Sequence, residues 1–205
     1  MPPAPSRSAP VDWLLVGLGN PGPAYDWTPH NIGFMVAASL RVRWGLGKPT
    51  TKYRGLISQG SAIVGHDPQT GMPLRARVAL LEPQTFMNEA GRSVGPASGA
   101  LHVPAQRVIV VHDEIDLPFA EIRTRLGGGL AGHNGLKSVK AALGTAEFQR
   151  VRIGVGRPPS TDPELVAAYV LGRFRQPRDE VQALVVAATA AVEELLAAEL
   201  PKLLK

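Results

Sequence analysis

Apolar residues recur in two patterns along this chain, and the two patterns alternate. Residues 13–18 and 108–111 are continuous apolar runs, which is typical of buried strands. Elsewhere apolar residues return every three or four positions, as Ile32, Val36 and Leu40 do, which predicts helices. The expected helices are residues 31–43, 89–101, 134–143 with Asn134 as its N-cap, 164–171 and 178–200. The expected strands are residues 13–18, 53–64, 74–81, 108–111, 121–125 and 151–155. Strands that alternate with helices predict an α/β fold.

Turn residues indicate how these elements connect. Residues 66–71 (HDPQTG) lie between two expected strands and predict a hairpin, so the sheet should be mixed. We expect a single catalytic domain over residues 12–200, in which a mixed, twisted β-sheet carries helices on both faces and the C-terminal helices are included. Residues 1–11 lack the apolar segment of a signal peptide and predict a disordered tail.

Composition then limits the classes of function. The 205 residues carry a formal net charge of +5, which favours a polyanionic partner without identifying it. The chain has no cysteine, so disulfides, thiolate metal ligands and cysteine nucleophiles are excluded within it. No apolar run reaches the length of a membrane span, and we expect a cytoplasmic protein.

Residues 17–22 (GLGNPG) match the dinucleotide-binding pattern G-x-G-x-x-G and follow an expected strand. That pattern binds a pyrophosphate only when a helix begins inside it, because the free backbone N–H groups must face the phosphates. Pro21 and Pro23 remove two such donors, and the next expected helix begins about ten residues later. The acidic residue expected about twenty residues further on is also missing. The motif therefore predicts a tight turn.

Residues 91–95 (GRSVG) match the nucleophile elbow G-x-S-x-G, and Ser93, Asp113 and His133 follow in the order of an α/β-hydrolase triad. The elbow requires a strand that ends at the serine. Pro83 ends the nearest expected strand well before Ser93, and the intervening residues have a helical pattern. A serine hydrolase therefore remains only as a disfavoured alternative.

Three polar loops remain, and each follows an expected strand: residues 19–31, 85–88, and 112–113 together with 132–135. Ligands of open α/β sheets bind beyond the carboxyl ends of the strands, so we expect these loops to meet. They contain His30 as a candidate general base and Asp113 as a carboxylate that can fix its tautomer. They also contain asparagine amides that can hold a carbonyl and stabilise an oxyanion: Asn20, Asn88 and Asn134. This set suits hydrolysis of a reactive acyl bond such as an ester.

Longer blocks of the sequence resemble the bacterial peptidyl-tRNA hydrolase family. The blocks are VGLGNPGPAYDWTPHNIGF (16–34), LLEPQTFMNEAG (80–91), HDEIDLPFAEIR (112–123), LGGGLAGHNGLKS (126–138) and FQRVRIGVGRP (148–158). They occur in the order and spacing of the family and cover nearly all of residues 12–175. The resemblance implies a peptidyl-tRNA hydrolase-like fold. It also implies cleavage of the ester between a peptide and the 3′-terminal ribose of tRNA, which recycles tRNA released during translation.

The resemblance also implies roles for individual residues. His30 is expected to be the catalytic base, Asp113 to orient and polarise it, and Asn20 to position the base and the substrate. Asn88 and Asn134 are expected to hold the peptide backbone and the 3′ end, and Tyr25 and Met87 to form pocket walls. The enzyme is expected to use water activated by His30 with no covalent intermediate, and to need no metal or cofactor. It is expected to act as a monomer without contacting membranes.

Arginine residues are expected to bind the tRNA itself. Arg125 and Arg152 match family positions that clamp the 5′-phosphate, and residues 121–157 contain seven Lys or Arg against two Glu. The chain departs from the family pattern at Pro29, where a basic residue is usual, and at Leu130 in the glycine-rich loop. A binding protein that kept the RNA contacts and lost the chemistry is the second alternative. The full set of Asn20, His30, Asn88, Asp113 and Asn134 argues against it.

Overall fold

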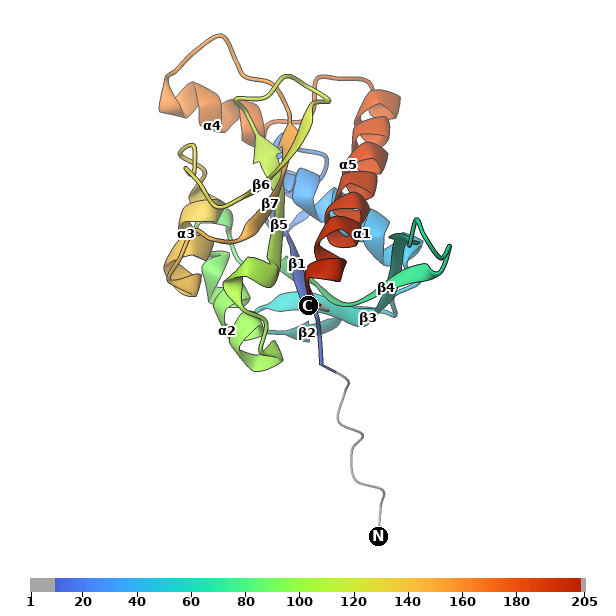
Figure 1. Cartoon of the computed structure of the whole chain (residues 1–205). Helices are drawn as coiled ribbons and strands as arrows, with labels where there is room; N and C mark the ends of the chain where they lie inside the picture. The colour runs from blue at the N-terminus through green and yellow to red at the C-terminus, as the bar shows by residue number, and fades with distance from the viewer. Residues whose placement is uncertain (1–9, 204–205) are drawn as a thin grey trace.

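The computed structural model describes residues 10–203, so nearly all of the predicted tail, residues 1–11, lies outside the described residues. Figure 1 shows a central sheet with helices packed on both sides. The strands are β1 (Trp13–Gly17), β2 (Thr50–Lys52), β3 (Gly55–His66), β4 (Pro73–Pro83), β5 (Val108–Glu114), β6 (Ile122–Leu126) and β7 (Gln149–Gly154). The helices are α1 (Ile32–Arg43), α2 (Gly91–Leu101), α3 (Asn134–Leu143), α4 (Pro163–Leu171) and α5 (Arg178–Glu199).

The seven strands form one mixed sheet in the order β2-β3-β4-β1-β5-β7-β6. The pairs β1–β4, β1–β5 and β5–β7 are parallel, whereas β2–β3, β3–β4 and β6–β7 are antiparallel. The predicted mixed sheet and the hairpin between β3 and β4 are therefore confirmed. Because β1, β4, β5 and β7 run in parallel, their carboxyl ends meet at one edge, where the three polar loops were expected.

Alternate residues of the central strands enter two separate cores. Trp13 and Leu15 of β1 pack with α1 and α5 on one face, while Leu14 and Val16 pack with α2 and α3 on the other. All residues of β1 and β5 are buried, as their continuous apolar runs predict. The sheet thus lies between two helical layers, α1 with α5 on one face and α2 with α3 on the other (Figure 1).

Helix α1 approaches the sheet very closely at its first turn. A Cβ atom added at Gly33 would lie 2.5 Å from the backbone oxygen of Val111, and one added at Gly17 would lie 2.3 Å from the backbone oxygen of Gly33. Only glycine fits at either position. The contact brings the start of α1, and with it His30, against the end of β5.

Two local predictions were wrong. Asn134 was expected to cap α3, but the capping residue is His133, whose side chain accepts hydrogen bonds from the backbone N–H groups of the first turn. The strand expected at residues 108–111 extends to Glu114, so His112 is a buried strand residue and does not lie in a loop. In both cases tertiary contacts at the end of β5 decided the local structure.

One helix of the described chain, α5 with the short turn after it, is long and apolar enough by length and composition to cross a membrane. Its apolar side instead packs on α1 and the sheet, and includes Val181, Leu184, Val185 and Val192. This is the packing of a core helix.

Candidate active site

His30 and Asp113 meet at the edge of the sheet where the parallel strands end. His30 lies in a 3-10 turn, Pro29–Asn31, directly before α1, and Asp113 is the penultimate residue of β5. Nδ1 of His30 lies 2.9 Å from Oδ1 and 3.1 Å from Oδ2 of Asp113. Since a carboxylate only accepts hydrogen bonds, Nδ1 carries the proton, and Nε2 of the neutral ring is left with a free lone pair.

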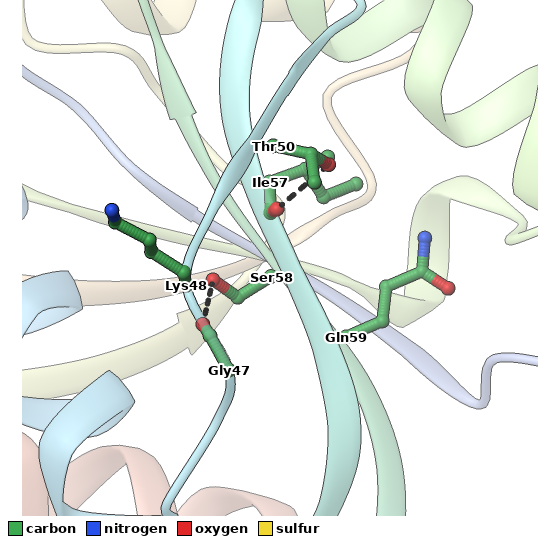
Figure 2. A pocket seen from close by; sticks show the side chains of 6 residues that line it. All are labelled: Gly47, Lys48, Thr50, Ile57, Ser58 and Gln59. Atoms are coloured by element: carbon green, nitrogen blue, oxygen red, sulfur yellow. Dashed lines mark hydrogen bonds between the residues drawn. The ribbon is translucent and has the colours of Figure 1, made fainter.

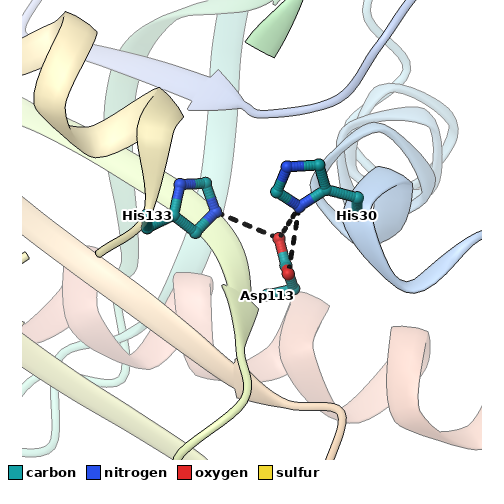
Figure 3. A group of neighbouring side chains, drawn as sticks. All are labelled: His30, Asp113 and His133. Carbon is teal, nitrogen blue, oxygen red and sulfur yellow. Dashed lines mark hydrogen bonds and ion pairs between the residues drawn. The ribbon is translucent and has the colours of Figure 1, made fainter. Parts of the chain in front are cut away.

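A second imidazole binds the same carboxylate. Nε2 of His133 lies 3.1 Å from Oδ1 of Asp113, so the aspartate accepts from two histidines (Figure 3). The rings of His30 and His133 lie 5.1 Å apart between centroids. A third ring, that of His112, is fully buried 5.0 Å from His133 and donates from Nδ1 to the backbone oxygen of Asp113 at 2.7 Å.

The surroundings shift the pKa values of these groups in opposite directions. Burial lowers the pKa of His30, but the charge of Asp113 and the hydrogen bond to it outweigh burial and leave that pKa raised. Burial raises the pKa of Asp113, yet its two histidine partners hold it well below its usual range. Burial, above all, lowers the pKa of His112 to about 3. Asp113 is therefore an anion and His112 is neutral at neutral pH.

Asn20 is tied into the same region by a chain of hydrogen bonds. The side chain of Asn31 accepts from the backbone N–H of Asn20 at 2.8 Å and donates to its backbone oxygen at 2.9 Å. Oδ1 of Asn20 accepts in turn from the backbone N–H of Met87 at 2.7 Å. The loops after β1 and β4 and the turn that holds His30 are thereby fixed to one another.

A cavity of about 530 Å³ opens beside the histidines, and it is lined by His30, Asp113, Glu114, His133, Asn134, Lys137, Arg157 and apolar residues of α4. Asn134, one of the residues expected to hold the substrate, lies in its wall. Asn20 and Asn88 do not line this cavity: Asn20 is 6% exposed, and Asn88 lies on the exposed side of the turn Met87–Glu89.

The two residues expected to form pocket walls lie along the same edge of the sheet. Met87 is buried, and a Cβ atom at Gly135 would lie 2.5 Å from its sulfur, so it packs against the start of α3. Tyr25 packs edge-on against Phe86, with 6.5 Å between ring centroids. Phe86 itself is 56% exposed, so this pair forms an aromatic surface. Phe86 lies two residues before Asn88 in the sequence.

Basic side chains gather on the neighbouring strands β6 and β7. Arg123 lies opposite Arg152, and Arg125 opposite Arg150, so all four project from one face of the sheet. Arg152 donates to Glu114 at 3.1 Å, while Arg125 is exposed beside Gly128. Arg150 is buried and donates to the backbone oxygens of Gly128 and Gly129 at 2.7 and 2.6 Å. Arg150 therefore holds the glycine-rich loop before α3.

Two other chemistries fit the site less well. His30, Asp113 and His133 are residue types that bind transition metals, and their ligand atoms lie within 4.8 Å of one another. Hydrogen bonds within the trio already account for that proximity. Ser93 is fully buried in α2, and its Oγ finds no partner among the described residues, so the serine-hydrolase alternative is excluded by access.

A separate cavity of about 240 Å³ lies on the β2 side of the sheet, between β3 and the chain before β2. Figure 2 shows its lining, in which Oγ of Ser58 donates to the backbone oxygen of Gly47 and Lys48 is the one titratable side chain. A lone lysine offers no acid–base pair, so the chemistry is assigned to the histidine cluster.

Comparison with known proteins identifies the family of this chain. Residues 14–205 match the family model described as peptidyl-tRNA hydrolase. The chain belongs to the peptidyl-tRNA hydrolase family. Family members include the peptidyl-tRNA hydrolase of Mycolicibacterium smegmatis, 48% identical over 90% of this chain and 91% of that protein. That of Mycobacterium marinum is 47% identical over 89% and 90% of the two chains. The crystal structure of peptidyl-tRNA hydrolase from Acinetobacter baumannii superposes with a TM-score of 0.75 at 35% identity, covering 93% of this chain and 91% of that one.

Family membership and fold class are thus confirmed as the sequence predicted them. Sequence reasoning missed three residues of this peptidyl-tRNA hydrolase-family site: Asn31, His112 and, as a partner of Asp113, His133. His133 stood at a predicted helix start, but histidine is not a preferred cap, so nothing local indicated its contacts. Asn31 follows His30 directly, and only the folded structure shows that it binds Asn20.

Proposed function

We propose that this protein hydrolyses the ester that joins a peptide to the 3′-terminal ribose of tRNA. The observation that carries the proposal is the His30–Asp113 pair at a cavity, in a chain of the peptidyl-tRNA hydrolase family. Nδ1 of His30 is held by the carboxylate, and the other ring nitrogen is free to accept a proton. An imidazole in this state is suited to activate water.

During the reaction His30 accepts one proton and later donates it. A water molecule adds through its oxygen to the ester carbonyl carbon while Nε2 of His30 takes one of its protons. Asp113 stabilises the imidazolium that forms. When the bond between the carbonyl carbon and the ribose oxygen breaks, His30 returns the proton to that oxygen. The products are a peptide carboxylic acid and the 3′-hydroxyl of tRNA, with no covalent enzyme intermediate.

Asparagine amides hold the substrate in this scheme. The Nδ2 group of Asn20 takes no part in the bonds to Asn31 and Met87, and donates to the ester carbonyl as charge develops on its oxygen. Asn134, in the cavity wall, and Asn88, exposed in the turn Met87–Glu89, hold the 3′ end and the peptide backbone. Tyr25 and Met87 do not line that cavity, and they bound the substrate beside it.

The arginine-rich face of β6 and β7 binds the tRNA backbone. Arg125 is exposed and engages the 5′-phosphate directly. Arg152 donates to Glu114 in the free protein, and binds the phosphate beside that carboxylate or in place of it. Such contacts read charge and shape and not base sequence. The protein works as a cytoplasmic monomer without a metal, and a role limited to binding is disfavoured by the complete hydrogen-bonded pair.

Release of free tRNA from N-acyl-aminoacyl-tRNA by the purified protein, with a chelator present, tests the proposal. We expect turnover of the blocked substrate and little turnover of unblocked aminoacyl-tRNA. Tight binding of the blocked substrate without tRNA release would instead support a binding protein. Activity that disappears with the chelator and returns with a divalent ion would overturn the metal-free scheme.

A further inference from the structure

The imidazole of His133 makes hydrogen bonds at both of its ring nitrogens. Nδ1 lies 3.1 Å from the backbone nitrogen of Gly135 and 3.4 Å from that of Leu136, and accepts from both N–H groups. A ring nitrogen accepts a hydrogen bond through its lone pair, and a nitrogen with a free lone pair carries no proton. The two donors belong to the first turn of α3, where the helix dipole also disfavours a positive charge.

The other ring nitrogen therefore carries the proton. Nε2 of His133 lies 3.1 Å from Oδ1 of Asp113, which can only accept. We infer that His133 is a positioning residue for the His30–Asp113 pair: the start of α3 fixes it as the neutral tautomer protonated at Nε2, and that proton is donated to Asp113. This inference rests on the proposed function, in which His30 is the base.

The second donor changes how strongly Asp113 acts on His30. Oδ1 of Asp113 accepts from both rings, so part of its negative charge is already stabilised by His133. A carboxylate stabilised in this way attracts a proton on His30 less strongly. Asp113 raises the pKa of His30. The bond from His133 limits that rise, which keeps Nε2 of His30 free to accept a proton near neutral pH.

The other charged and titratable groups around the trio do not replace this effect. His112 faces His133 from β5, but it is buried and its pKa is lowered to about 3, so it stays neutral. Glu114, Lys137 and Arg157 line the cavity from β5, α3 and the loop after β7. Glu114 is paired with Arg152, and its side chain is 5% exposed. His133 alone among these groups joins the carboxylate of Asp113 and a helix start.

Two substitutions separate the contacts of His133. Asparagine places an oxygen where Nδ1 stands, so H133N keeps a good helix cap and loses the donor to Asp113. Glutamine places an amide nitrogen near the position of Nε2, so H133Q keeps the donor and loses the cap. We expect the acid limb of the kcat/KM profile to move to higher pH by roughly half a unit to one unit in H133N, because the pKa of His30 rises. In H133Q the limb stays in place while the melting temperature falls.

Nitrogen-15 NMR of the wild-type protein, labelled at histidine, tests the tautomer without any variant or substrate. We expect the His133 ring to be protonated at Nε2 alone across the pH range of activity. Protonation at Nδ1, or at both nitrogens, would overturn the inference. Equal movement of the acid limb in both variants, or movement in neither, would do the same. A wild-type protein that does not hydrolyse the ester would contradict the proposed function, while the NMR result would still determine the tautomer.

Discussion

Nδ1 of His30 lies 2.9 Å from Oδ1 of Asp113, although the two residues are 83 positions apart in the sequence. The contact exists because β1 and β5 are adjacent parallel strands and α1 begins directly over their ends. The carboxylate is 2% exposed and the imidazole 13%, so the pair is shielded from water on one side and open to a cavity on the other. Its energetics can therefore be probed by substitutions that leave the core intact.

Replacing Asp113 by asparagine removes the charge and keeps the shape. We expect kcat to fall by about 10²- to 10⁴-fold, because His30 loses the anion that fixes its tautomer and stabilises its protonated form. Single-turnover hydrolysis of a blocked aminoacyl-tRNA measures the loss. D179N, at an exposed position in the first turn of α5, is the matched control and should retain full activity. Wild-type turnover in D113N would contradict the role of the pair.

Replacing His30 by alanine removes the base itself. We expect a loss of about 10²-fold or more in kcat with little change in the Kd for tRNA, since the arginines of β6 and β7 are untouched. Filter binding at fixed salt measures the Kd in parallel with the rate. H66A, at the exposed end of the β3–β4 hairpin, is the control for loss of a histidine. Equal losses of rate and of tRNA affinity would point to a folding defect in place of a catalytic one.

Substitutions at Asn20 can separate the role of its side-chain oxygen from the role of its side-chain nitrogen. N20D keeps the oxygen that accepts from the Met87 N–H group, and removes the Nδ2 donor assigned to the ester carbonyl. We expect N20D to lose about 10²-fold or more in kcat. N20A leaves the buried N–H group of Met87 unpaired, and should in addition lose about 1–3 kcal/mol of unfolding free energy. Urea denaturation measures the second loss, and wild-type stability of N20A would contradict the structural role of the oxygen.

The sequence predicted the parts of this site that lie within single elements. Continuous apolar runs identified β1 and β5. The polar loop that follows β1 and the polar residues at the end of β5 indicated His30 and Asp113 as candidates. The strand β2 was missed because Thr50, Thr51 and Lys52 are exposed and show no pattern. The contacts of His133 were missed because they depend on how α3 meets β5, which no local spacing encodes.

Arg125 and Arg152 can be tested by comparing two substrates. Removal of either side chain should weaken binding of full-length peptidyl-tRNA and reduce the slope of log Kd against log salt by about one each. Hydrolysis of a short 3′-end substrate without the tRNA body should be spared. K48A removes one positive charge near β2, at the opposite edge of the sheet, and controls for net charge. Equal losses on long and short substrates would contradict the phosphate contact.

His112 should make the protein sensitive to acid. Its pKa is lowered to about 3 in the folded chain, mainly by burial, against about 6.5 when unfolded. Between these values the unfolded chain binds a proton that the folded chain does not, so stability is lost as pH falls, by up to about 1.4 kcal/mol per pH unit. His30 has the opposite sign, since its raised pKa adds stability that is lost as pH rises.

Urea denaturation at several values from pH 6.5 down to pH 4.5 isolates this contribution. H112N keeps an amide donor for the backbone oxygen of Asp113 and removes the titration. We expect its stability to fall less steeply with decreasing pH than that of the wild type, by about 1 kcal/mol per pH unit. H66N, at an exposed position, should leave the slope unchanged. Parallel curves for H112N and the wild type would contradict a lowered pKa of His112 in the folded chain.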